Sequence, residues 1–127
     1  MKNGLARASF GVQHVLVLGT FAQAALAGFF LYTQPTLIHL HKHLGSLLIV
    51  VALAVFVLSV LTGFERRHGL VPLAAVQLVL MAGQFVLGTL GRNVYVAAAL
   101  HVPNAFIVFT VSMLWLVRAR RAIKGER

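Results

Sequence analysis

Four long apolar runs divide the chain, and a short polar segment separates each run from the next. The runs cover about residues 10–32, 42–64, 70–91 and 96–118. Each approaches the roughly 20 residues that an α-helix needs to cross about 30 Å of hydrocarbon. Because lipid offers no partners to open backbone groups, spans of this kind are expected to be helical. The pattern therefore predicts four transmembrane helices.

The polar breaks are short. The sequence TQPT (residues 33–36) contains a proline, which cannot donate to a helix ladder and disfavours helical geometry in the residue before it. ERRHG (residues 65–69) indicates a charged loop and GRN (residues 91–93) a turn. Connections this short make successive helices antiparallel. We expect one all-α domain over residues 1–127, an up-down-up-down transmembrane four-helix bundle with a basic tail at residues 119–127.

The composition supports a bilayer environment and excludes several kinds of site. Hydrophobic residues make up 60% of the chain and charged residues 10%, whereas soluble domains are about half apolar and about a quarter charged. There is no cysteine, which excludes disulfides and thiolate metal sites. The two carboxylates, Glu65 and Glu126, are too few for carboxylate-pair catalysis. We therefore expect no catalytic activity of the chain's own.

The basic residues predict the orientation. A net charge of +9 is compatible with nucleic acid binding, but the basic residues flank the apolar runs, which points to lipid instead. With the N-terminus inside, only Lys42 and Arg92 of the eleven basic residues lie outside, which leaves nine inside. Short cytoplasmic loops and ends carry such an excess. The expectation is a multi-pass protein of the bacterial inner membrane with both termini cytoplasmic.

A weak internal repeat relates residues 19–45 to residues 79–105. Each segment places a glutamine in mid-helix, small residues after it, a loop, and a histidine at the start of the next helix. The pairs are Gln23 with His41 and Gln84 with His101. Two tandem αα units would give pseudo-twofold symmetry about the membrane normal. The second and fourth helices would then run parallel on one diagonal, with both histidines on the outer side.

Three histidines open the second helix, at His39, His41 and His43. Successive helical residues turn by about 100°, so the first and third share a face and His41 points almost the opposite way. If His41 faces the bundle, Gly45 follows on its stripe and leaves room for a flat macrocycle. Two alternatives remain. All three can be interfacial, or His39 and His43 can hold copper or zinc at the outer mouth.

His101 lies in the apolar sequence AALHVPNA, where a polar side chain is costly and indicates a function. Asn104, three residues on, could orient a ligand there. The alternative is that His101 forms an interhelical hydrogen bond to Gln84 or Asn104 that only helps the helices to associate. Gln23 and Gln84 are candidates for lining a haem or quinone cavity, whereas for Gln77 we expect interhelical hydrogen bonding.

The remaining histidines, His14 and His68, are expected at the inner interface. A second haem between them is an alternative that the sequence leaves open.

The sequences QAALAG, LHKHLGSLLIV, GQFVLGTLG and AALHVPNAFIVF resemble a family of small bacterial four-helix membrane proteins of unknown function. They are also similar to one four-helix half of the haem A synthase family. The likeness covers about residues 15–120 and implies that His41 and His101 ligate haem. That family has a glutamate three residues before its first histidine, where this chain has Ile38. The fold likeness therefore does not carry over the haem-modifying reaction.

The leading hypothesis is a b-type haem-binding protein, an electron-transfer module or haem-bearing subunit of a membrane complex. Neutral imidazole suits iron, and two axial histidines leave no open position for a substrate. The expected partners are lipid, other membrane subunits or a second copy, with quinone as a further candidate. The alternative is a cofactor-free accessory subunit that packs against a larger membrane complex. The expected haem-site residues are His41, His101, Gly45, Gln23, Gln84 and Asn104.

Overall fold

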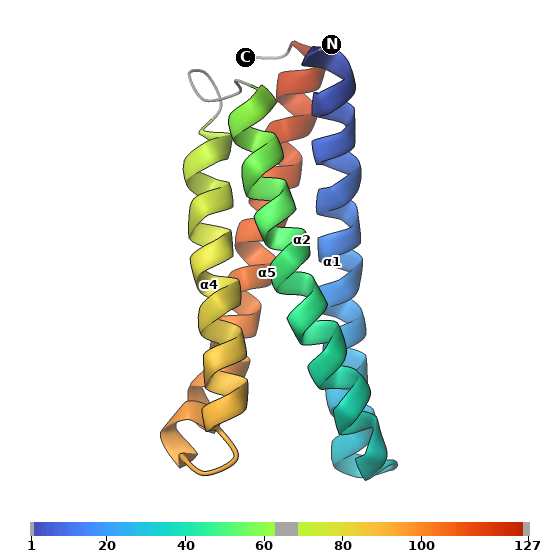
Figure 1. The fold of residues 1–127 in the computed structure, drawn as a ribbon, viewed down its shortest axis with the longest axis vertical. Helices are drawn as coiled ribbons and strands as arrows, with labels where there is room; N and C mark the ends of the chain where they lie inside the picture. Colours follow the sequence, from blue (N-terminus) through green and yellow to red (C-terminus); the bar gives the residue numbers. More distant parts are fainter. Residues whose placement is uncertain (1, 63–68, 126–127) are drawn as a thin grey trace.

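The computed structural model describes residues 2–62 and 69–125 (Figure 1). Within these ranges the chain forms four long helices: α1 (Lys2–Tyr32), α2 (Ile38–Thr62), α4 (Leu70–Leu90) and α5 (Tyr95–Lys124). A short 3-10 helix, η1 (Pro35–Leu37), precedes α2. All four long helices are long and apolar enough to cross a membrane. The predicted all-α transmembrane four-helix bundle is confirmed.

The helices pack in a ring. α1 packs on α2, α2 on α4, α4 on α5, and α5 on α1, so α1 faces α4 across one diagonal and α2 faces α5 across the other. Both chain ends lie at one end of the bundle, which we call the terminal end (Figure 1). The opposite end, which contains Tyr32 and Leu90, is called the hairpin end. Toward the hairpin end the α1–α2 and α4–α5 hairpins diverge (Figure 1).

Two helices extend beyond their apolar spans. α1 begins at Lys2 rather than near residue 10, and α5 continues to Lys124, through most of the expected basic tail. The extension of α5 has a packing reason, because Ala119 on its inner face is fully buried. The helix then ends at Gly125, whose φ of 73° is the left-handed conformation typical of a helix C-terminus. Hydropathy marks where the membrane span ends, which need not be where the helix ends.

The connections at the hairpin end follow the expected turn chemistry. α1 ends where the backbone N–H groups of Thr33 and Gln34 both donate to the carbonyl of Phe29, each at 2.9 Å. The turn through Pro35 leads directly into α2, which begins at Ile38, four residues before the predicted start at 42. Residues 91–93 form the predicted turn. Of the predicted loop at 65–69, residues 65–68 lie outside the described residues.

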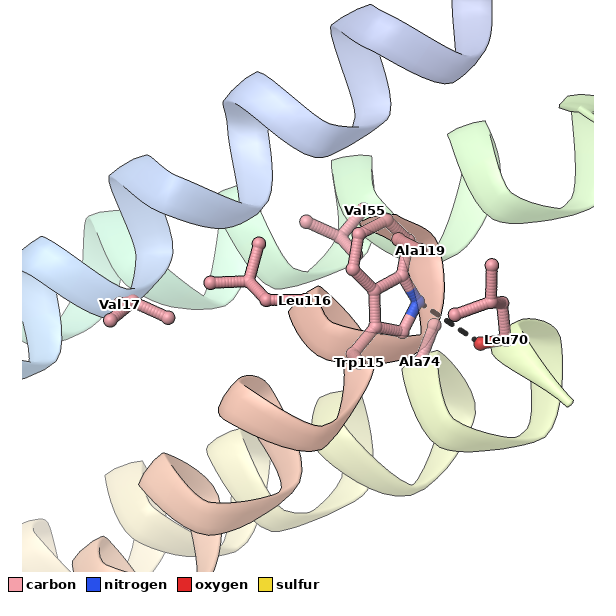
Figure 2. Close-up of a cluster of buried hydrophobic side chains, with 7 residues drawn as sticks. All are labelled: Val17, Val55, Leu70, Ala74, Trp115, Leu116 and Ala119. Carbon is pink, nitrogen blue, oxygen red and sulfur yellow. Dashed lines mark hydrogen bonds between the residues drawn. The ribbon is translucent and has the colours of Figure 1, made fainter. Parts of the chain in front are cut away.

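Two apolar clusters form the core. The first lies toward the terminal end and surrounds Trp115, whose indole N–H donates to the carbonyl of Leu70 at 3.1 Å (Figure 2). It consists of Val17, Val55, Leu70, Ala74, Trp115, Leu116 and Ala119. The second lies at mid-height and consists of Leu16, Leu48, Ala52, Met81 and Val108. Together they hold the four helices closed between the terminal end and the middle of the bundle.

A buried amide pair crosses the α1–α4 diagonal. The Gln13 amide donates to Oε1 of Gln77 at 2.9 Å, and the Gln77 amide donates back to Oε1 of Gln13 at 3.1 Å. Gln13 also donates to the carbonyl of Ser112 on α5 at 3.0 Å. The interhelical role expected for Gln77 is confirmed. Its partner Gln13 was not singled out from the sequence.

The outer surface is apolar over most of its height. Large side chains such as Leu18, Val79 and Phe106 are exposed by 66%, 70% and 70%. A soluble monomer rarely exposes so much apolar surface, whereas hydrocarbon accommodates it. Tyr32 and Tyr95, both 86% exposed, lie at the hairpin end, where interfacial aromatic residues are expected. The chain is a multi-pass membrane protein.

Candidate functional site

His41 and His101 meet across the α2–α5 diagonal in the hairpin half of the bundle. Their ring centroids are 6.3 Å apart and the ring planes make an angle of 61°. Both helices run from the hairpin end toward the terminal end, so the two histidines enter the bundle at similar depth. The juxtaposition expected from the repeat is therefore present. That the two rings are ligands stays a prediction.

The α1–α2 hairpin holds His41 by a reciprocal clasp with Gln23. The Gln23 amide donates to the backbone carbonyl of His41 at 2.9 Å, and Nδ1 of His41 donates to the backbone carbonyl of Gln23 at 3.2 Å. A backbone carbonyl only accepts, so the proton of the neutral ring lies on Nδ1. Nε2 keeps its lone pair and bonds to no residue that the structure describes. Histidines that ligate metals commonly donate their other ring N–H to a carbonyl in this way, which fixes the tautomer and the ring orientation.

The α4–α5 hairpin holds His101 through a chain of two amides. Nδ2 of Asn104 donates to the carbonyl of Leu80 at 3.0 Å and to Oε1 of Gln84 at 2.7 Å. Nε2 of Gln84 then lies 3.2 Å from Nε2 of His101. The Leu80 carbonyl can only accept, which orients the Asn104 amide and, through it, the Gln84 amide. Gln84 therefore donates to Nε2 of His101, and the ring proton lies on Nδ1.

Two glycines make room for these side chains. A Cβ at Gly88 would lie 2.8 Å from Cε1 of His101, so only glycine lets the ring lie against α4. A Cβ at Gly45 would lie 2.8 Å from Nε2 of Gln23. The sequence analysis expected Gly45 to make room for a macrocycle. In the structure the Gln23 amide takes that space, and Gly88 is the glycine beside a histidine ring.

The other histidines lie away from this pair. His39 and His43 are exposed on the opposite side of α2, as the helical period predicts. In residues 2–62 and 69–125, no group of three or more histidine, cysteine or acidic side chains could hold a metal. The copper or zinc alternative therefore lacks a third such ligand there.

His14 is exposed on α1, where its Nδ1 bonds to the carbonyl of Phe10 at 2.8 Å. Its suggested partner in a second haem site, His68, lies outside the described residues.

Unpartnered polar atoms concentrate at the histidine pair. Over the described part of the chain, three buried side-chain atoms have no hydrogen-bond partner: Ser9 Oγ, Gln23 Oε1 and His101 Nδ1. An unmade bond of this kind costs about 1–3 kcal/mol. Most buried polar groups in proteins are paired, so an orphan needs an explanation. Two of the three orphans belong to the residues that hold or form the histidine pair, which leaves an unused acceptor and an unused donor beside the two rings.

The donor set fits a metal that brings its own equatorial ligands. Two imidazoles on opposite sides of one metal have ring centroids about 6 Å apart, because each metal–nitrogen bond is about 2 Å long. The observed ring centroids are 6.3 Å apart, but the ring planes make an angle of 61° and Nε2 of His101 is bonded to Gln84, so His101 would have to be released before both rings could bind one metal. A bare ion would need further ligands, and residues 2–62 and 69–125 contain no carboxylate or thiolate. A metal in a planar macrocycle needs only two axial donors.

No protein-family model, no curated protein and no solved structure matched the chain in the comparisons with known proteins.

Proposed function

We propose that the protein binds b-type haem between His41 and His101 and serves as an electron-transfer module or haem-bearing subunit of a membrane complex. The observation that carries the proposal is the 6.3 Å separation of the two rings on the parallel helices α2 and α5.

Haem is favoured over a bare ion because residues 2–62 and 69–125 place two imidazoles at this point and contain no carboxylate or thiolate to complete the coordination of an ion. Haem with two axial histidines supplies one-electron redox chemistry and leaves no open position for a substrate. The protein supplies the axial ligands and a dry surrounding. The mid-height cluster around Leu48, Met81 and Val108 gives the pair an apolar neighbour on its terminal side.

Each hairpin positions one histidine: α1–α2 positions His41, and α4–α5 positions His101. The backbone carbonyl of Gln23 accepts the Nδ1 proton of His41, which leaves the lone pair of Nε2 free for a metal. Gly88 leaves room for the His101 ring to lie against α4. The clasp with Gln23 therefore holds the His41 ring in place before any cofactor arrives, which reduces the entropy lost on binding to this ligand.

The proposed location is the bacterial inner membrane with both termini cytoplasmic. The terminal end carries Arg7, Arg118, Arg120, Arg121 and Lys124, whereas the hairpin half carries Lys42 and Arg92. In membrane proteins, lysine and arginine residues accumulate in the short loops and chain ends that lie in the cytoplasm. The histidine pair would then lie in the outer half of the membrane, where it could exchange electrons with partners on that side.

One observation favours a second candidate, a cofactor-free accessory subunit. Nε2 of His101, an atom that a metal would need, already accepts a hydrogen bond from Gln84. Bonds of this kind join membrane helices without any cofactor. In this case the exposed apolar faces of the helices would pack against a larger membrane complex.

The experiment is an absorption spectrum of the detergent-purified protein, with reduced-minus-oxidised difference bands and a haem-extraction assay. Haem content should fall sharply in His41→Ala and in His101→Ala. The matched controls are His39→Ala and His43→Ala, which alter the same triplet on its exposed face and should keep full haem content. A folded but colourless wild type that also takes up no added haem would refute the proposal and favour the accessory subunit.

A further inference from the structure

The two histidines of the pair differ in which nitrogen is free. Nε2 of His41 bonds to no described residue, because the Gln23 clasp uses only Nδ1 and the backbone. Nε2 of His101 accepts from the Gln84 amide at 3.2 Å, while its Nδ1 is buried and unpartnered. The weak sequence repeat therefore ends in two unequal histidines, one open and one occupied.

The hydrogen bond from Gln84 to Nε2 of His101 depends on Asn104, which orients the Gln84 amide. Asn104 has both amide hydrogens engaged, one by the Leu80 carbonyl and one by Oε1 of Gln84. With Oε1 used as an acceptor, the face that Gln84 presents to His101 is its N–H. The His101 lone pair at Nε2 cannot bond a metal and this N–H at the same time.

We propose that Gln84, oriented by Asn104, is a positioning residue that latches His101, so that a metal-bearing ligand binds His41 first and His101 only after Gln84 turns away. This inference rests on the proposed function. In the latched state Nδ1–H of His101 is buried and makes no hydrogen bond of ordinary geometry, although the backbone of Gln84 acts on the same ring. The latch is one neutral hydrogen bond, so a single iron–nitrogen bond is sufficient to replace it.

The first test needs no haem. The full chain, prepared without haem in detergent with isotope-labelled histidine, is studied by NMR, which distinguishes the two neutral ring tautomers. In the wild type both His41 and His101 should carry the proton on Nδ1. In Asn104→Leu the Gln84 amide is no longer oriented and can turn its oxygen to the ring, so His101 should gain a population with the proton on Nε2, while His41 stays unchanged.

The matched control is Gln23→Leu. Gln23 is the repeat counterpart of Gln84, but its amide bonds to the backbone of His41 and not to the ring. This variant should leave the tautomer of His101 unchanged. A wild type in which His101 already carries its proton on Nε2 would overturn the latch, and so would an Asn104→Leu variant with an unaltered His101.

The second test measures haem binding. Gln84→Leu removes the competing N–H, so haem should bind about threefold more tightly, the factor that a typical interhelical hydrogen bond in a membrane represents. Gln23→Leu should show no such gain. Weaker binding in Gln84→Leu would mean that Gln84 supports the ligand and does not compete with it, which overturns the latch. If the wild type binds no haem, the proposed function fails, while the tautomer measurement still decides whether Gln84 orients His101.

Discussion

The buried amide pair on the α1–α4 diagonal should be a measurable source of stability. Gln13 and Gln77 exchange two hydrogen bonds, at 2.9 and 3.1 Å, and both side chains are fully buried. Interhelical hydrogen bonds in membrane proteins contribute about 0.6 kcal/mol each on average. The two bonds should therefore give a coupling free energy of about 1 kcal/mol in a double-mutant cycle.

The single variants should cost more than their share of that coupling. Gln13→Leu also removes the bond to the Ser112 carbonyl and leaves the Gln77 amide buried without a partner. An orphaned buried group costs about 1–3 kcal/mol. The double variant, Gln13→Leu with Gln77→Leu, leaves no orphaned amide. It should therefore be less destabilised than the sum of the two single variants by at least about 1 kcal/mol.

The assay is reversible unfolding in mixed micelles with increasing denaturing detergent, followed by helical circular dichroism. The wild type, both single variants and the double variant are compared at one lipid-to-detergent ratio. Strictly additive losses would show that the two amides do not stabilise each other, and would refute the interpretation of this pair as an interhelical lock.

Two further predictions follow from contacts of single residues. Gly88→Ala places a Cβ 2.8 Å from Cε1 of His101 and should displace the ring, which lowers the haem content of the purified protein. In the control Gly28→Ala the new Cβ meets nothing within 4 Å, so haem content should stay at the wild-type level. Equal haem content in the two variants would contradict the close approach of the His101 ring to Gly88. Trp115→Phe keeps an aromatic ring in the buried cluster but removes the indole donor to the Leu70 carbonyl. The free energy of unfolding should therefore fall by about 1 kcal/mol in the same micelle assay. An unchanged free energy of unfolding would show that this hydrogen bond adds no stability.

Much of the fold could be read from hydropathy because the bilayer leaves few choices. Apolar spans of sufficient length must be helical, and short polar connections force antiparallel neighbours. The helix ends were less accessible, because helix formation and membrane burial stop at different places. In α5 the helix continues past the apolar span, since Ala119 packs into the core and the basic residues lie on the remaining faces.

The meeting of His41 with His101 followed from periodicity and the weak repeat. The helical period separated His41 from its neighbours His39 and His43, and the repeat placed two histidines on diagonal helices. The hydrogen bond between His101 and Gln84 was one of the alternatives that the sequence offered, and the structure shows it. Which atom donates in that bond did not follow from the sequence. Hydrogen-bond direction depends on which carbonyl lies beside Asn104, and no spacing in the sequence encodes that contact.

The pairing of Gln13 with Gln77 was not predicted from the sequence. Its partner Gln77 is 64 residues away and on the diagonal helix, so neither sequence proximity nor adjacent-helix packing points to it. A buried glutamine in an apolar span is the signal that could have found it, because such a side chain needs a partner in the bundle.

The most direct test of the account is the spin state of ferric haem bound to the purified chain, measured by absorption and electron paramagnetic resonance. Two axial imidazoles should give a six-coordinate, low-spin iron in the wild type, at a single haem per chain. His101→Ala should convert it to a high-spin species or lose it, while His43→Ala should leave it low-spin. An unchanged low-spin spectrum in both His41→Ala and His101→Ala would contradict the claim that these two histidines hold the haem.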